Sequence, residues 1–219
     1  MRHHVHDRAR QLPAAHSVTA SELLALMAIR DGVVVSSPQM TSALEEAVAS
    51  VAVRIDDVQE FRARAAVVAQ ALGPAVIGEL CTRFHSPPPM EPPGFGPEQR
   101  GLGGWLSAWQ FAIFELLFAF ESAALPVLRQ VAFGAYDWIQ GNAIEVLARL
   151  AARGIEREQI IAELRREFPR LQVEAQLYSV GPLLYHAAQD PAVAAVVQEL
   201  ESMPEWRAAA EELGRAADA

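Results

Sequence analysis

Apolar residues recur at helical spacing along most of this chain, and the pattern is clearest in the segment from Trp105 to Gly154. The segment reads as an apolar helix, a second helix that carries Pro126, a tight turn at 134–137 and an amphipathic helix. The apolar positions of this last helix are Ile139, Ala143, Val146, Leu147, Leu150 and Ala151. Their spacing predicts a helix with one buried face.

The polar residues of the same helix predict its exposed face and its two ends. Glu145, Arg149 and Arg153 follow one another at intervals of four, acid before base, which is the order that stabilises a solvated helix face. Asp137 stands where an N-cap carboxylate can accept hydrogen bonds from the first free amides. Gly154 stands where a left-handed residue ends a helix. Capping chemistry and apolar pattern therefore predict the same helix.

Caps, glycines and first-turn prolines divide the rest of the chain into further helices. The expected helices cover residues 21–30, 38–54, 56–73, 74–84, 155–168, 172–189, 191–200 and a last one from 204 onward. The pair Gly181-Pro182 is expected to kink or split one of them. The β-like run Val33–Val35 is too short to found a sheet. The fold class predicted is all-α, with about nine to ten helices.

Two stretches lack a helical pattern and set the domain organisation. Residues 1–17 are polar and predict a flexible tail. Residues 86–104 hold six prolines and five glycines, which excludes a helix or strand interior and predicts a loop that is either functional or disordered. Within it, Met90 and Phe95 are the candidates for contact with a partner or with the protein's own flank. One helical domain over residues 18–219 is expected.

The charge of the chain narrows the classes of partner. The formal net charge is -9, divided into -2 over residues 1–100 and -7 over residues 101–219. Such a surface repels nucleic acid, whereas it fits a basic protein. All eighteen basic residues are arginine. Without lysine the chain can form neither a P-loop of the usual kind, nor a kinase ATP site, nor a Schiff base with pyridoxal phosphate.

Membrane, export and cofactor signals are not expected from the sequence. The polar N-terminus lacks the apolar core of a signal peptide. The apolar run 111–128 contains Glu115 and Glu121, which are costly in lipid. The histidines at 3, 4 and 6 lie in the predicted tail, and the single cysteine, Cys81, cannot form an internal disulfide. We therefore predict a cytoplasmic protein that binds no membrane, metal or cofactor.

Three segments share one design, an apolar helix, a break and a second helix rich in Leu and Ala. They are residues 64–80, 111–128 and 142–164. Helix pairs repeated at intervals of roughly thirty to fifty residues are typical of a helical solenoid, in which each pair buries its inner face against the next.

Residues 123–151 resemble a HEAT repeat. Residues 125–128 resemble the proline-bearing first helix, Asp137 lies at the turn, and residues 142–147 resemble the second helix. The basic residue usual near the start of the second helix is missing, and Gln140 and Asn142 lie in that region. The resemblance to HEAT-repeat proteins implies an α-solenoid of stacked antiparallel helix pairs. It also implies a non-catalytic binding scaffold.

Residues spaced for catalysis are few. Cys81 and His85 are four apart in one predicted helix, but a buried cysteine near a helix end is the simpler interpretation. His186 and Asp190 are also four apart, and a polar helix end with a cap explains them. Glu115 lies in an apolar run, so it must find a partner or become protonated if it is buried. A structural hydrogen bond explains it more simply than acid catalysis.

Our leading hypothesis is a scaffold that binds another protein, in its more specific form an immunity protein or inhibitor that neutralises a basic toxin. The predicted partner-binding residues are Tyr136, Asp137, Gln140, Asn142, Glu145 and Arg149, with the 86–104 loop as an adjunct. Trp105, Trp109, Trp138 and Tyr136 gather near this region of the chain, where aromatic residues serve either a core or a binding hot spot.

Two alternatives stay open. The first is an enzyme or small-ligand protein with a pocket inside a helical bundle, with Glu115 or His186 at its heart. The second is a nucleic-acid-binding solenoid, which needs its arginines on one concave face, and the acidic charge disfavours it. The arginines concerned are Arg62, Arg64, Arg149 and Arg153.

Overall fold

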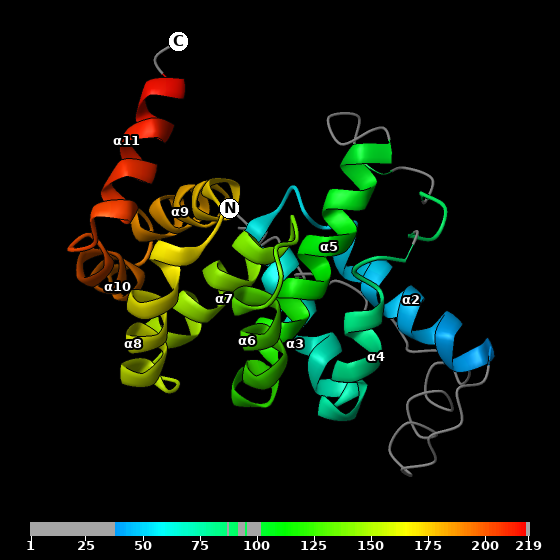
Figure 1. The fold of residues 1–219 in the computed structure, drawn as a ribbon. Coiled ribbons are helices and arrows are strands. Elements are labelled where there is room, and N and C mark those ends of the chain that lie inside the picture. The colour runs from blue at the N-terminus through cyan, green and yellow to red at the C-terminus, as the bar shows by residue number, and fades with distance from the viewer. Residues whose placement is uncertain (1–37, 87, 92–94, 96–101, 218–219) are drawn as a thin grey trace, which may run out of the picture. The chain divides into compact units, whose positions relative to one another are not determined.

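Ten α-helices make up the described part of the chain (Figure 1). This computed structural model describes residues 38–86, 88–91, 95 and 102–217, which belong to the unit Val35–Ala219. The helices are α2 (Pro38–Ala52), α3 (Val58–Leu72), α4 (Ile77–Thr82), α5 (Leu102–Ala119), α6 (Leu125–Phe133), α7 (Gln140–Ala152), α8 (Arg157–Glu167), α9 (Val173–Ala187), α10 (Pro191–Leu200) and α11 (Pro204–Ala217). No strand occurs among these residues, so the all-α prediction is confirmed. The predicted tail at 1–17 and the helix at 21–30 lie outside the described residues.

Capping chemistry sets several helix boundaries as predicted. The carboxylate of Asp57 accepts hydrogen bonds from two first-turn amides of α3, each at 3.0 Å. Asp190 caps α10, where its carboxylate accepts from the amide of Ala192 at 2.8 Å. Gly154 follows α7 with a φ of +83°, the left-handed conformation that glycine adopts without a steric cost.

The structure departs from two local predictions. Asp137 is not the N-cap of α7, because the helix begins at Gln140 after a turn in which the Gln140 amide donates to the Asp137 carbonyl at 2.9 Å. One oxygen of the Asp137 carboxylate accepts from the amide of Ile139, ahead of the helix, at 3.4 Å, and the other lies 3.1 Å from Nε2 of His85. The pair Gly181-Pro182 was expected to kink or split its helix. It does not split α9, which continues through Pro182 to Ala187. A proline costs its helix one hydrogen bond, and the packing of α9 against its neighbours outweighs that loss here.

Part of the predicted 86–104 loop packs on the protein's own flank. The indole N–H of Trp105 donates to the carbonyl of Pro89 at 2.7 Å. The ring of Phe95 meets Trp105 edge to face with centroids 5.0 Å apart, and Phe95 is buried. Met90, by contrast, is 93% exposed. Helix α5 already begins at Leu102, inside the range predicted as loop.

Helix α7 lies in the middle of the described helices (Figure 1). It packs against α5, α6, α8, α9 and α10. Eleven of its thirteen residues are buried. Its first turn passes so close to α9 that a Cβ atom added to Gly141 would lie 2.6 Å from Cβ of Tyr178. The helix is therefore surrounded by protein and has no broad solvated face.

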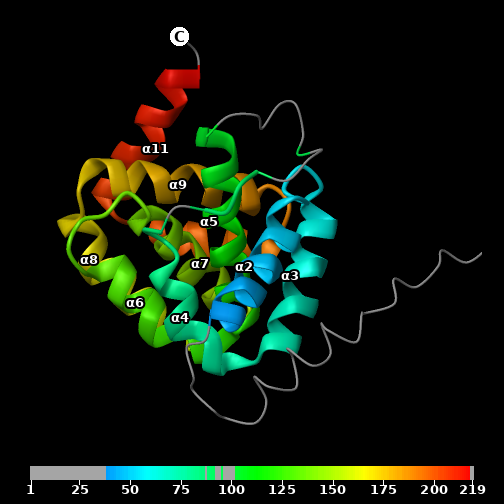
Figure 2. The ribbon, with the colours of Figure 1, turned by 90° about the vertical axis from the view of Figure 1, so that its right-hand side faces the viewer.

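The other helices pack on either side of this centre. Helices α2 and α3 pack on each other and on α5 (Figure 2). On the C-terminal side, α9 packs on α10 and on α11. Trp206 of α11 is fully buried, and its ring lies 5.3 Å from that of Phe168. The core thus runs from α2 to α11 through α7.

Candidate functional site

Five ionisable side chains from four helices meet beside α7. They are Arg62 from α3, Glu115 from α5, Glu145 and Arg149 from α7, and His186 from α9. Glu115, Glu145 and Arg149 are each at most 7% exposed. Charged groups are rarely buried to this degree unless they are paired, so the pairing of this charged ring decides what it can do.

Arg149 is the centre of the ring. Its two terminal nitrogens donate to the two carboxylate oxygens of Glu115 at 2.9 Å each, and Nη1 also donates to Glu145 at 3.1 Å. The guanidinium lies over the ring of Phe118, 4.0 Å from its centroid. Burial alone would lower the pKa of Arg149, but the charges of Glu145 and Glu115 outweigh it and raise that pKa. The guanidinium is thus held as a permanent, fully paired cation.

His186 links the other side of the ring. Its Nε2 lies 2.9 Å from a carboxylate oxygen of Glu145, and its Nδ1 lies 2.9 Å from Nη2 of Arg62. Arg62 also lies 3.9 Å from Glu115 and closes the ring. Burial alone would raise the pKa of Glu145, but Arg149 and His186 outweigh it and hold that pKa below its usual value.

The charges of the ring balance when the imidazole is neutral. Two carboxylates then face two guanidinium groups, and every member contacts at least two others. A buried charge is tolerated when its partners satisfy it, whereas removal of one partner leaves an uncompensated charge. The ring therefore fastens α3, α5, α7 and α9 to one another at one point.

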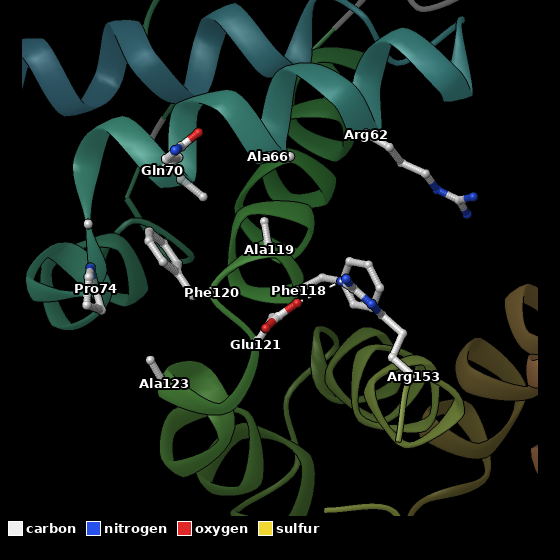
Figure 3. Close-up of a pocket in the computed structure, with 12 residues that line it drawn as sticks. Arg62, Ala66, Gln70, Pro74, Phe118, Ala119, Phe120, Glu121, Ala123 and Arg153 are labelled. Atoms are coloured by element: carbon white, nitrogen blue, oxygen red, sulfur yellow. Dashed lines mark ion pairs between the residues drawn. The ribbon is translucent and has the colours of Figure 1, made fainter. Parts of the chain in front are cut away.

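A pocket of about 400 Å³ lies beside the ring, between α3, the end of α5 and the end of α7 (Figure 3). Its lining includes Arg62 of the ring, and also Gln70, Phe118 and Phe120. At its wall Glu121 pairs with Arg153 at 3.0 Å, with both side chains about half exposed. Glu121 has a φ of +54°, a conformation that is uncommon for a residue other than glycine. The pocket thus combines apolar walls with the ion pair of Arg153 and Glu121, while the Arg62 side chain extends away from the other lining residues (Figure 3).

The structure divides the six predicted partner-binding residues into two groups. Tyr136 is 49% exposed, the side chain of Asp137 is partly exposed, and Asn142 is half-buried. Gln140, Glu145 and Arg149 are buried. The prediction of a solvated face through Glu145 and Arg149 was therefore wrong, because both side chains find their partners on other helices. These buried residues are held inside the protein.

Exposed aromatic residues lie where the chain enters α7 and on α9. Trp138 is 45% exposed and Tyr136 is 49% exposed, whereas Trp105 and Trp109 belong to the core. On α9, Tyr178 is 57% exposed, and its Cβ lies against Gly141 in the first turn of α7. The sequence pattern missed Tyr178, because a helix with several apolar faces does not reveal which of them is covered.

The other pairs proposed from sequence spacing have structural roles. Burial raises the pKa of the Cys81 thiol to about 11, which keeps it protonated and unreactive at neutral pH. His85, four residues on, contacts Asp137. Asp190 caps α10 as expected, while His186 joins the charged ring. The described residues contain no cluster of three side chains that could hold a metal ion.

The arginines required for a nucleic-acid surface are engaged in contacts of their own. Arg149 is buried, Arg153 pairs with Glu121, and Arg64 donates to the hydroxyl of Ser50 at 3.1 Å. No single helix among those described is both long enough and apolar enough to cross a membrane. The consecutive helical segments Val58–Leu72 and Pro74–Thr82 are together long and apolar enough to cross a membrane, but the chain bends by 93° between them.

Comparison with known proteins gave no match. No family model matches the chain, and no match was found among curated proteins or solved structures. We therefore infer the function from the side chains of this chain and their geometry.

Proposed function

We propose that this chain is a protein-binding helical scaffold whose contact surface is centred on Trp138. The observation that carries the proposal is the contrast among the tryptophans. Trp105, Trp109 and Trp206 are each at most 2% exposed, whereas Trp138 is 45% exposed. Tyrosine and tryptophan dominate binding hot spots, because a large rigid side chain gains much when a partner covers it.

The neighbours of Trp138 extend this surface. Tyr136 lies two residues before it, and Tyr178 lies against the first turn of α7 that follows it. Glu174 is exposed one helical turn before Tyr178, on the same face of α9. The surface therefore combines exposed aromatic rings with the exposed carboxylate of Glu174.

The charge of the chain supports a basic partner. A net charge of -9, of which -7 falls in residues 101–219, attracts a basic protein and accelerates its association. An immunity protein or inhibitor that neutralises a basic toxin is the more specific form of the proposal. We also propose a cytoplasmic location, because the polar N-terminus lacks the apolar core of a signal peptide.

The packing of successive helices supports a HEAT-like arrangement as part of the proposal. Helix α2 packs on α3, α6 on α7, α7 on α8, and α9 on α10, as neighbours in a stack of helix pairs do. Helix α7 additionally packs on α5, α9 and α10, which a stack limited to sequential neighbours does not require.

Capture of the partner tests the proposal. The wild-type chain and the Trp138→Ala variant are immobilised and exposed to lysate of the native host, and the captured protein is then purified for calorimetry. Trp138→Ala should weaken binding by about thirtyfold, the loss typical of a hot spot. Phe111→Ala removes a ring of similar exposure (41%) from α5 and should change affinity less than about threefold. A rise in salt should weaken binding. Equal affinity of Trp138→Ala and Phe111→Ala for the captured partner would overturn the proposal.

A second candidate function is the binding of a small molecule in the pocket beside the ring. The observation in its favour is that Arg62 lines the pocket and contacts both His186 and Glu115, the two residues predicted for such a site. A ligand copurified with the chain and lost in an Ala66→Trp variant, which fills the pocket, would favour this function over the scaffold.

A further inference from the structure

The imidazole of His186 is bonded at both of its nitrogens. Nδ1 lies 2.9 Å from Nη2 of Arg62, and Nε2 lies 2.9 Å from Oε1 of Glu145. The His186 side chain is 16% exposed, whereas that of Arg62 is 38% exposed. The two contacts join α9 to α3 on one side and to α7 on the other.

These contacts define the protonation state of the His186 imidazole. A guanidinium group can only donate hydrogen bonds, so Nδ1 of His186 must accept from Arg62 and carries no proton. An ionised carboxylate can only accept, so Nε2 must carry the proton that it donates to Glu145. The geometry is satisfied by the neutral imidazole with its proton on Nε2.

A second proton on His186 would alter the two contacts in opposite ways. It would place an N–H on Nδ1, directly facing the N–H of Arg62 at a hydrogen-bond distance. It would also add a positive charge beside Arg62 and Arg149, while the bond to Glu145 would become charge-assisted and stronger.

The charged groups around the imidazole determine which of its two contacts breaks when the second proton binds. Glu145 faces the imidazole from α7, and Arg149 binds the same Glu145 oxygen. Arg62 faces the imidazole from α3, and Glu115 lies behind Arg62 and Arg149 on α5. With a neutral imidazole the ring has no net charge, and with an imidazolium it carries one excess positive charge. Arg62 is the most exposed member, so it can leave for solvent at the least cost in desolvation.

We propose that His186 is a proton-operated latch that holds Arg62 at neutral pH and releases it on acidification. Release frees α3 from α9 at this point and leaves the guanidinium of Arg62, which in Figure 3 extends away from the other residues of the pocket, without its imidazole partner. The latch does not depend on the proposed partner surface at Trp138.

The tautomer is the first test. Nitrogen-15 NMR of the full chain reports which imidazole nitrogen carries the proton and the pH range in which the second proton binds. At neutral pH the His186 signals should show a protonated Nε2 and an unprotonated Nδ1. A proton on Nδ1 at neutral pH would overturn the proposal, because Arg62 could not then donate to that atom.

The second test compares the stability effect of an Arg62 substitution in the wild type and in a His186→Gln variant. His186→Gln keeps a donor for Glu145 and an acceptor for Arg62 but cannot take up a proton. Arg62→Met should raise the unfolding constant by about tenfold in both backgrounds at neutral pH. Below the pH range found by NMR, the same substitution should have almost no effect in the wild-type background and keep its effect in the His186→Gln background. A tenfold effect in the wild-type background at both pH values would contradict the latch.

Discussion

At the scale of single residues, Arg149 differs from Arg153, which lies one turn further along the chain, directly after the end of α7. Arg149 is buried and forms hydrogen bonds with Glu115 and Glu145, whereas Arg153 forms one half-exposed ion pair with Glu121. The two arginines lie one turn apart at the end of α7 and have identical chemistry. Their expected contributions to stability differ because water screens one pair and is excluded from the other.

Substitution of the two arginines measures this difference. Arg149→Met should lower the free energy of unfolding by about 3–5 kcal/mol, because it leaves two buried carboxylates without their cation. Arg153→Met should lower it by about 1 kcal/mol or less, as for other exposed pairs. Urea denaturation followed by circular dichroism gives both values. Similar losses in the two variants would show that the ring is not buried in solution.

Glu145 makes the stability of the protein depend on pH. Its pKa in the folded protein lies below the ordinary value of 4.5. The ionised carboxylate therefore stabilises the fold above pH 4.5, and this contribution is lost as the pH falls through the lower pKa of the folded protein.

The Glu145→Gln variant isolates that contribution. Below pH 4.5 the free energy of unfolding should fall less steeply with decreasing pH in Glu145→Gln than in the wild type, since the variant has no carboxylate to protonate. Urea denaturation at a series of pH values measures both slopes. The exposed Glu174→Gln substitution is the control and should leave the wild-type slope unchanged. A wild-type slope in Glu145→Gln would contradict the assignment.

At the scale of elements, the contact between α7 and α9 depends on a glycine. A Cβ atom added to Gly141 would lie 2.6 Å from Cβ of Tyr178 and 2.9 Å from the carbonyl oxygen of Ala175. Both neighbours are fixed parts of α9, so a side chain at this position requires the two helices to move apart. The close approach also explains why α7 can be surrounded by five helices.

Alanine scanning of glycines tests this packing. Gly141→Ala should lower the free energy of unfolding by about 1–3 kcal/mol through overpacking, although alanine favours a helix. Gly214→Ala is the matched control in α11, where nothing lies within 4 Å of the added Cβ. It should raise the free energy of unfolding by about 0.5–1 kcal/mol through helix propensity. Thermal melts of the two variants should shift in opposite directions.

At the scale of the whole described unit, the central position of α7 predicts how the protein unfolds. Helices on both sides of α7 pack against it, and the charged ring connects α3 and α5 with α9. A stack of repeats with contacts between neighbours alone can unfold in parts. Here the shared contacts through α7 favour one cooperative transition.

Two spectroscopic probes can distinguish these outcomes. Tryptophan fluorescence of a variant that keeps Trp206 alone reports on α11, and far-ultraviolet circular dichroism reports on all helices. The two urea transitions should coincide in midpoint within error. An earlier transition at Trp206 would indicate that α11 and its neighbours unfold as a separate part.

The sequence alone determined the helices and many of their ends. Apolar periodicity and capping residues act over a few positions, so the roles of Asp57, Asp190 and Gly154 follow from their immediate neighbours in the chain. The same local rules fail at Asp137, where a turn delays the start of α7, and at Pro182, where packing with other helices outweighs the effect of the proline. The existence and type of the elements were therefore predictable, and their boundaries less so.

Only the tertiary structure decided which polar residues are buried. Glu145 and Arg149 have the spacing of a solvated helix face, yet Arg149 pairs with Glu115, 34 residues earlier in the chain, and Glu145 with His186 on α9. Likewise, the exposure of Trp138 depends on what other helices leave uncovered. A helical pattern repeats over three or four residues, whereas a buried charge is defined by partners on other helices. For that reason the chain specifies its helices locally and its candidate site only after they have packed.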